Sequence, residues 1–137
     1  MTDHPTLESP VVVLDDEECW TLLSGEHFGR LGYRLVDEIH VVPVNYAVHD
    51  GVLAVRTAAG NKLLAAELRS EVGFEIDGFE GDEAWSVLVR GHLRRLDEHR
   101  TRLLEDQVPS WVPLLKYEVV EIAPETVVGL RFLVQRG

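Results

Sequence analysis

The stretch FGRLGYRLVDEIHVVPVNYAVHDGVLAVRT, residues 28–57, decides the fold class. Apolar and polar residues alternate over 28–36, 39–48 and 52–57, which is the spacing of half-buried β-strands. Asp37-Glu38 and Asp50-Gly51 separate these runs and are typical of tight turns. Pro43 lies inside the second run and therefore places that strand at a sheet edge or in a bulge. The stretch predicts three antiparallel strands joined by hairpins.

Further elements on both sides of this stretch extend the sheet. Helices are predicted at 15–24, where Asp15 and Glu18 suit an acidic version of the capping box, at 61–69, and from Asp97 towards Pro109. Strands are predicted at 72–79, 84–96, 116–122 and 126–134, with Ala123-Pro124 separating the last two. Helices that are inserted between hairpin-linked strands, rather than alternating with them, indicate a mainly antiparallel sheet. About seven strands are enough to close a small barrel.

The composition limits the number of domains and the kind of partner. The chain has 137 residues, 24 of them acidic and 13 basic, and a net charge of -11. Nucleic acid and anionic lipid both require a basic footprint, so neither a nucleic-acid partner nor a membrane partner is expected. This length and an apolar content of 45% predict one domain, at 11–137, after a flexible N-terminal tail at 1–10.

The sequence also argues against a disulfide, a signal segment and a metal site. A single cysteine, Cys19, permits no intrachain disulfide, as is typical of cytoplasmic proteins. The first ten residues lack the pattern of a secretory signal, and no apolar run is long enough to cross a bilayer. The six histidines show none of the HxH, HxxxH or HExxH spacings of metal ligands. We therefore expect a cytoplasmic protein without a metal.

Residues 55–62, VRTAAGNK, are the most informative for function. A predicted strand ends in Arg56-Thr57, a small glycine-containing loop follows, and a predicted helix begins at Asn61-Lys62. The N–H groups of a helix start, a guanidinium and an ammonium together suit one phosphate. The GxxxxGK[ST] spacing of a P-loop is absent. Taken alone, the spacing favours a strand-to-helix turn that carries two ordinary surface charges.

Two other stretches are candidates for ligand contacts. In Pro43-Val44-Asn45 the proline removes a backbone donor, which leaves neighbouring carbonyls and the Asn45 amide able to face a ligand. The alternative, favoured when the stretch is taken alone, is an edge-strand bulge in which Asn45 satisfies the backbone. Trp85, followed by Ser86 at the start of the 84–96 strand, suits either stacking on a planar ligand or filling the core.

The order of these pieces resembles the pyridoxamine 5′-phosphate oxidase-like family of FMN-binding split barrels. More narrowly, it resembles the short flavin proteins related to nitroimidazole-resistance reductases. The resemblance covers roughly residues 14–133 and rests on the order of five short motifs: FGRL at 28–31, PVNY at 43–46, RTAAGNK at 56–62, FEID at 74–77 and WSVLVRG at 85–91. It implies a mainly β fold, an antiparallel split β-barrel of six to seven strands with short helices.

The resemblance also implies a homodimer with two FMN sites at the subunit interface. Carried over residue by residue, the phosphate-binding stretch corresponds to Arg56, Thr57, Asn61 and Lys62. The strand that lines the isoalloxazine ring, largely through its main chain, corresponds to Pro43, Val44 and Asn45. The remaining flavin contacts, some of them from the second subunit, correspond to Trp85, Ser86 and Arg131.

The function that the resemblance implies is an FMN-dependent oxidoreductase. Such an enzyme passes a hydride from reduced nicotinamide, NAD(P)H, through FMN to a small-molecule substrate, and the protein binds and orients the flavin. Pyridoxamine 5′-phosphate oxidase activity itself is not expected, because those enzymes carry a longer C-terminal region. One alternative is a flavin-binding dimer without turnover. The other is a deazaflavin-dependent reductase of the same fold, whose acidic cofactor tail would meet a basic groove of Arg90, Arg94, Arg95, Arg100 and Arg102.

Overall fold

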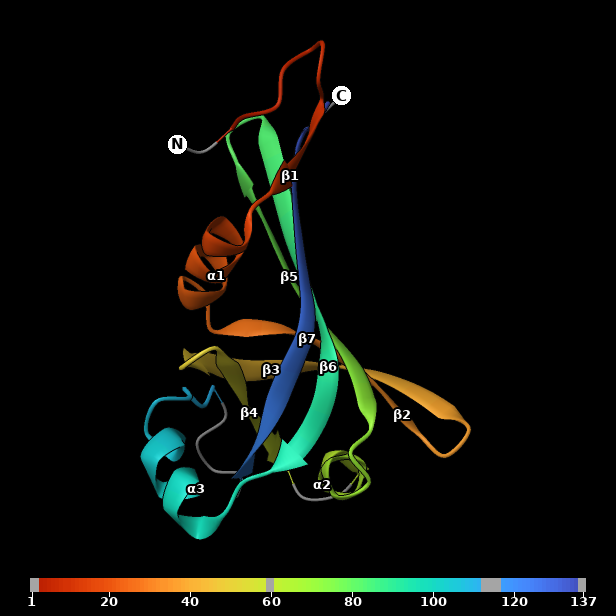
Figure 1. The fold of residues 1–137 in the computed structure, drawn as a ribbon, viewed down its shortest axis with the longest axis vertical. Helices are drawn as coiled ribbons and strands as arrows, with labels where there is room; N and C mark the ends of the chain where they lie inside the picture. Colours follow the sequence, from red (N-terminus) through yellow and green to blue (C-terminus); the bar gives the residue numbers. More distant parts are fainter. Residues whose placement is uncertain (1–2, 59–60, 112–116, 136–137) are drawn as a thin grey trace.

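The computed structural model describes residues 3–58, 61–111 and 117–135, and these form one antiparallel sheet of seven strands with three short helices (Figure 1). In chain order the elements are β1 (Val11–Leu14), α1 (Asp16–Ser24), β2 (Phe28–Leu35), β3 (Glu38–His49), β4 (Val52–Ala58), α2 (Asn61–Glu67), β5 (Glu71–Glu80), β6 (Glu83–Arg95), α3 (Glu98–Glu105) and β7 (Tyr117–Leu133). The strand order is β1-β7-β4-β3-β2-β5-β6, and β6 also pairs with β7, so strands β2 to β7 close into a barrel. The predicted mainly β, antiparallel barrel with short helices is confirmed.

The two predicted hairpins form, with the second turn at Asp50-Gly51 as expected and the first at Val36-Asp37, one residue before the predicted Asp37-Glu38. β2 and β3 pair from Phe28 opposite Asn45 to Leu35 opposite Glu38. β3 and β4 then pair around a turn in which Asp50 and Gly51 have φ angles of 46° and 75°. Two consecutive positive φ angles are the geometry of the type I′ turn, whose twist matches that of the strands it joins. The local turn chemistry therefore sets the register of the first three barrel strands.

The barrel interior is filled by apolar side chains from the strands and from α1. Tyr46 and Phe74 meet edge to face at its centre, with their ring centroids 4.8 Å apart. The Tyr46 hydroxyl donates a hydrogen bond to the Leu23 carbonyl, 2.6 Å away, which anchors the end of α1 to β3. Burial raises the pKa of the Tyr46 phenol above its ordinary value, so the group remains a donor. At the start of α1, the predicted cap forms: Asp15 accepts a hydrogen bond from the Glu18 N–H at 2.8 Å.

The predicted break at Ala123-Pro124 is wrong, because β7 is one strand of 17 residues. It pairs with β6 from Leu133 to Val120 and with β4 from Ile122 to Tyr117. Pro124 lies where the β6–β7 register shifts between Arg90 and Gly91, which marks a β-bulge or irregularity. A proline at such a place leaves the strand continuous, because the ladder is already interrupted there. Local sequence rules predict that a strand ends at a proline. Here β6 pairs with β7 on both sides of Pro124, so β7 continues through it.

The first strand, β1, was not predicted. Its four residues are too few to show an alternating pattern, and it is held by pairing with β7 from Val11 opposite Phe132 to Leu14 opposite Gly129. Before it, the Thr6 N–H donates a hydrogen bond to the Ser9 carbonyl at 2.9 Å. The flexible tail at 1–10 stays a prediction.

The shift between β6 and β7 depends on the absence of a side chain at Gly91. A Cβ atom at this position would overlap the carbonyl oxygen of Ala123. We expect Gly91→Ala to lower the free energy of unfolding by about 1–3 kcal/mol, because a backbone carbonyl cannot move aside as a side chain can. Urea unfolding at fixed protein concentration measures the change.

Gly73→Ala is the matched control, since the nearest side-chain atom to a Cβ there, from Leu88, is 3.8 Å away. Equal stabilities for the two variants would contradict the steric role of Gly91.

Candidate functional site

The strand-to-helix stretch predicted to bind phosphate forms as expected, with β4 ending at Ala58 and α2 beginning at Asn61. Thr57 is fully buried, and Arg56 and Lys62 are partly buried. Residues 59–60 and the side chain of Asn61 lie outside what the structure describes. Two basic side chains and one hydroxyl are therefore carried on the two elements that flank this turn.

Lys62 has the electrostatic surroundings of an anion-binding group. Burial lowers the pKa of its ammonium below the ordinary value of lysine. Among the residues that the structure describes, no carboxylate forms an ion pair with it, although acidic residues outnumber basic ones by 24 to 13. A half-buried charge without an opposite charge is costly, and an anion bound beside it would offset that cost. The residues present thus fit a phosphate.

Arg56 has a structural role that the sequence did not reveal. Its Nε donates hydrogen bonds to the carbonyls of Val108 and Pro109, at 2.9 and 3.2 Å, and its Nη2 donates to the Glu105 carbonyl at 2.5 Å. The guanidinium therefore binds carbonyl groups at and beyond the C-terminal end of α3, where helices leave such acceptors unpaired. Arg56 is not an ordinary surface charge, because it ties the segment after α3 to the end of β4.

Among the described strands, the Pro43-Val44-Asn45 stretch of β3 has a ladder partner on one side only, although β3 itself lies between β2 and β4 in the sheet. β2 pairs with it on one side, whereas the pairing of β4 with β3 begins only at Tyr46. The Asn45 side chain is engaged within the chain: its Nδ2 donates to the His27 carbonyl at 3.1 Å, and its Oδ1 accepts from the Trp111 N–H at 3.2 Å. The backbone edge beside Asn45 is thus held in place by the segment that Arg56 also binds.

Trp111 and Phe28 complete this region, and neither was predicted. Their rings stack with centroids 4.5 Å apart and an angle of 7° between planes. The sequence showed only that prolines make 109–113 irregular; no local signal placed Trp111 beside the β2–β3 hairpin. Val108–Trp111 therefore lies between Arg56 of the predicted phosphate stretch and Asn45 of the predicted ring stretch.

The other three predicted contacts, Trp85, Ser86 and Arg131, lie on parts of β6 and β7 far along the ladder from the residues that pair with β4. Trp85 pairs with Arg131, which is twelve residues along β7 from Val119, the partner of Arg56. At about 3.3 Å per residue this separation is roughly 40 Å. Within one chain, the structure therefore does not bring Trp85, Ser86 and Arg131 together with Arg56.

The contacts of Trp85 and Arg131 also differ from the ligand contacts predicted for them. Trp85 is buried, and a Cβ on Gly78 would lie 2.6 Å from its ring, so the indole packs flat against that backbone. Arg131 is buried and forms ion pairs with Glu80 at 3.2 Å and Glu83 at 3.8 Å. Packing accounts for Trp85, whereas the buried Nε of Arg131 has no hydrogen-bond partner among the described residues.

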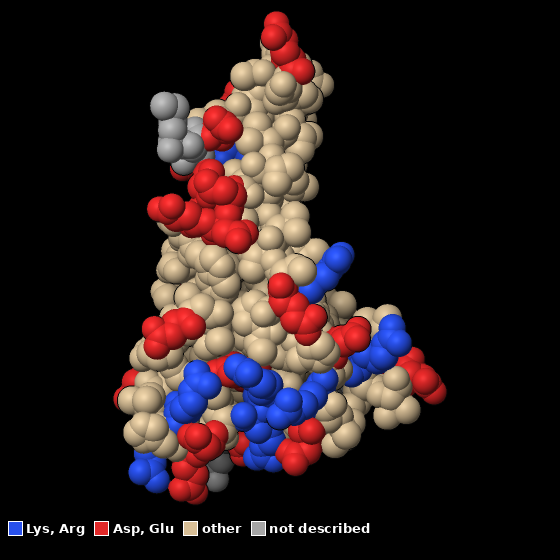
Figure 2. Space-filling model, viewed as in Figure 1, with Lys and Arg blue, Asp and Glu red and all other residues tan. Residues whose placement is uncertain are grey.

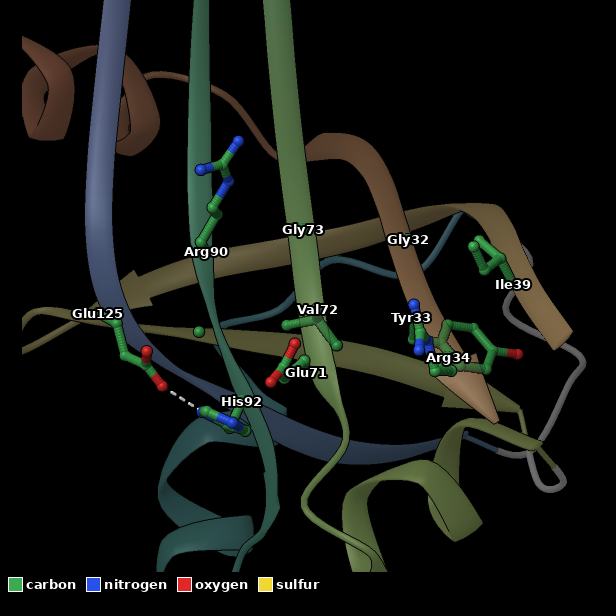
Figure 3. Close-up of a pocket in the computed structure, with 11 residues that line it drawn as sticks. Gly32, Tyr33, Arg34, Ile39, Glu71, Val72, Gly73, Arg90, His92 and Glu125 are labelled. Carbon is green, nitrogen blue, oxygen red and sulfur yellow. Dashed lines mark ion pairs between the residues drawn. The ribbon is translucent and has the colours of Figure 1, made fainter. Parts of the chain in front are cut away.

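A separate groove of about 490 Å³ crosses the outer face of β2, β5 and β6 (Figure 3). Gly32, Gly73 and Gly91 contribute to its lining, and none of the predicted flavin-contact residues does, although Arg90 of the basic groove expected for a deazaflavin tail does. Figure 3 shows His92 directed towards Glu125, with which it forms an ion pair. The groove is therefore distinct from the region around Asn45 and Arg56.

The basic groove expected for a deazaflavin tail is largely neutralised. Arg94 and Arg100 both pair with the buried Glu121, Arg95 pairs with Glu67 and Glu118, and Arg102 pairs with Glu98. Of the five arginines in that expected groove, Arg90 is the one with no such pair to a described residue. These pairings leave little free positive charge for a polyglutamate tail.

Two further findings concern the described part of the chain as a whole. It contains no group of three or more His, Cys, Asp or Glu side chains that could hold a metal ion. None of its helices is long and apolar enough to cross a membrane.

Comparison with known proteins identifies the family. The model of the pyridoxamine 5′-phosphate oxidase family matches residues 15–131, and the chain belongs to this family. A pyridoxamine 5′-phosphate oxidase candidate from Corynebacterium glutamicum has 35% identity and a TM-score of 0.78, and the match covers 91% of this chain and all of that one. The FAD binding protein from Mycobacterium smegmatis has 30% identity and a TM-score of 0.73, over 88% and 99% of the two chains.

A curated relative is also similar along nearly its whole length. This uncharacterised protein of Mycobacterium tuberculosis is 28% identical over 137 residues, which cover 94% of this chain and 90% of the relative. The resemblance drawn from five short motifs is therefore confirmed at the level of family and fold, which is the split barrel.

The carbonyl contacts of Arg56 predict a stability role that is separate from any ligand. We expect Arg56→Gln to lower the free energy of unfolding by about 1.5–3 kcal/mol, the usual value of hydrogen bonds to a charged group. Urea unfolding without added ligand measures it. The matched control is Arg90→Gln, which removes an exposed guanidinium without such a pair and should change stability by less than about 0.5 kcal/mol. An Arg56 variant as stable as this control would contradict the anchoring role.

Proposed function

We propose that this protein is an FMN-binding flavoprotein oxidoreductase that acts as a homodimer, transferring electrons from NAD(P)H to a small-molecule acceptor. Family membership supports a flavin-binding fold. The single observation that carries the assignment to this chain is the half-buried ammonium of Lys62, which no carboxylate of the described residues neutralises. FMN, when bound, supplies the redox chemistry, and the protein binds and orients it.

Each predicted residue then has a task set by its position. Lys62 offers a point charge to the phosphate, and Thr57 a hydroxyl on the neighbouring strand end. Arg56 has five N–H donors, so its guanidinium suits a shared role between carbonyl groups and a phosphate. The main chain of Pro43 and Val44, which pairs with β2 and with no other strand of the described residues, suits the polar rim of the isoalloxazine ring.

FAD is the second candidate cofactor. The Mycobacterium smegmatis relative, 30% identical, is an FAD binding protein, and the two flavins share the phosphate and ring that the site would hold. The deazaflavin alternative is weaker, because four of the five arginines that would hold its acidic tail are paired with carboxylates.

An apolar face of the long strands supports the homodimer. Side chains two residues apart on a strand share a face, and the register places Val11, Val13, Leu88, Val128, Leu130 and Phe132 together. Val13 and Val128 are 72% and 50% exposed. In Figure 2 the surface over β1 and the upper half of β7 carries almost no charged side chain. Exposed apolar surface of this kind is typical of subunit contacts.

The same face gives Ser86 its place in the proposal. Ser86 pairs with Leu130 and so lies among these apolar residues, although it is remote from Arg56 in the same chain. A second copy packed on this face would put Ser86 at the interface. A site shared by two subunits would bring the two groups of predicted contacts together, although they lie roughly 40 Å apart along the strand in one chain.

The cofactor assignment is tested by the purified protein. We expect a yellow protein whose released flavin has the mass of FMN. Lys62→Ala should weaken FMN binding by about 1–3 kcal/mol, or 5- to 150-fold in Kd, as for the loss of a charged hydrogen bond. Calorimetric titration measures this, and Lys62→Arg, which keeps the charge, should bind nearly as the parent does. A colourless protein that shows no heat of FMN binding would contradict the proposal.

The lowered pKa of Lys62 sets the expected pH dependence of this binding. A phosphate favours the ammonium form, so affinity should fall as pH rises through the pKa of Lys62 in the free protein. Because burial lowers that pKa, the fall should begin at a lower pH than for an exposed lysine. The titration is repeated at rising pH, and in Lys62→Arg the fall should disappear, because arginine stays charged.

The dimer is tested on the apolar face. Val128→Glu places a charge on a half-exposed position, so the fold should persist while the interface should not form. Sedimentation velocity should show a dimer for the parent and a monomer for this variant. Leu103→Glu, at a similarly exposed position on α3, should remain dimeric. A monomeric parent, or a dimer unaffected by Val128→Glu, argues against this interface.

A further inference from the structure

The exposed ring pair formed by Phe28 and Trp111 lies beside the predicted flavin-ring strand. Phe28 pairs with Asn45 across the β2–β3 ladder, and the Trp111 N–H donates to the Asn45 side chain at 3.2 Å. The stack is close to parallel, at 7°, with the centroids 4.5 Å apart. One face of the Trp111 indole is thus covered by the Phe28 ring.

The other face of Trp111 is open. The residue is 62% exposed although one of its faces is stacked, and Phe28 is 37% exposed. Tryptophan is usually highly buried, because its ring carries a large apolar surface. An indole held in a defined stack with its second face in solvent is suited to receive another planar ring.

The indole is also held in place before any ligand arrives. Two residues earlier in the chain, the Pro109 carbonyl accepts a hydrogen bond from Arg56, and Trp111 itself is bonded to Asn45. Asn45 is bonded in turn to the His27 carbonyl at 3.1 Å. A binding group that is already ordered loses less conformational entropy when a ligand binds.

We propose that Trp111, supported by Phe28, is a stacking platform for a planar, electron-poor heterocycle at this site. An indole is rich in π-electrons, and both the oxidised isoalloxazine ring and the oxidised nicotinamide ring of the product NAD(P)⁺ are electron-poor, so either ring matches its open face. The inference deepens the proposed function and rests on it for the nature of the ligand. It assigns a binding role to Trp111, which is not among the flavin contacts predicted from the sequence.

The test uses two probes that lack a phosphate, so that it does not depend on Lys62. Lumiflavin carries the isoalloxazine ring alone, and 1-methylnicotinamide carries the nicotinamide ring alone. Each is titrated into the full-length protein, and binding is followed by calorimetry and by quenching of tryptophan fluorescence. Trp111→Leu should weaken binding of at least one probe by roughly 2- to 12-fold, the usual worth of an aromatic pair.

Two controls separate stacking from general damage. Trp111→Phe keeps a stacking ring and should retain most of the affinity. Val36→Ala removes an apolar side chain that is 77% exposed at the opposite end of the β2–β3 hairpin from Phe28, and should leave both affinities unchanged. Circular dichroism and urea unfolding confirm that each variant is folded.

The outcomes are distinguishable from those of the proposed function. Loss of affinity for lumiflavin assigns the platform to the flavin ring, and loss for 1-methylnicotinamide assigns it to the nicotinamide ring. Equal binding of both probes by Trp111→Leu and the parent, or no binding of either probe by the parent, overturns the inference. If Lys62→Ala leaves FMN binding unchanged while Trp111→Leu weakens lumiflavin binding, the platform stands and the phosphate assignment fails.

Discussion

The antiparallel ladder between β6 and β7 is the interaction on which the rest of the structure depends. It runs from Glu83 opposite Leu133 to Arg95 opposite Val120. In the strand order β1-β7-β4-β3-β2-β5-β6, this pairing of β6 with β7 is the one that closes the barrel. Along its other edge β7 pairs with β4 from Tyr117 to Ile122 and with β1 from Gly129 to Phe132. The register shift lies at Gly91, where a Cβ has no room. A shift of this kind bends the strand locally, so β7 can continue for 17 residues.

A second constraint joins the two halves of the candidate site. Arg56 at the end of β4 and Asn45 in β3 both bind the segment after α3, one through its carbonyls and the other through the Trp111 N–H. A guanidinium donates several hydrogen bonds in fixed directions, so a single side chain can hold this irregular segment. Arg56 thus has a structural role in the fold in addition to its proposed contact with the phosphate.

Charge pairing explains why Lys62 stands out in an acidic chain. Most of the ion pairs involve arginine: Arg30 binds Glu75 and Asp77, Arg131 binds Glu80, and the buried Glu121 takes two partners from β6 and α3. A buried carboxylate requires such partners, because an unpaired one would be strongly destabilising. The net charge of -11 therefore argues against polyanionic partners, while a single phosphate depends only on the local balance around Lys62.

The sequence by itself determined the hairpins of β2, β3 and β4, the cap of α1, the start of α2 at Asn61 and the family, because these depend on near neighbours in the chain and on the order of short motifs. It did not determine the continuity of β7 through Pro124, the strand at Val11–Leu14, or the positions of Phe28 and Trp111 beside Asn45. Those features depend on pairing and stacking between residues that are distant in sequence. Tertiary structure alone also separated Trp85, Ser86 and Arg131 from Arg56, because two ends of one extended strand cannot meet within the same chain.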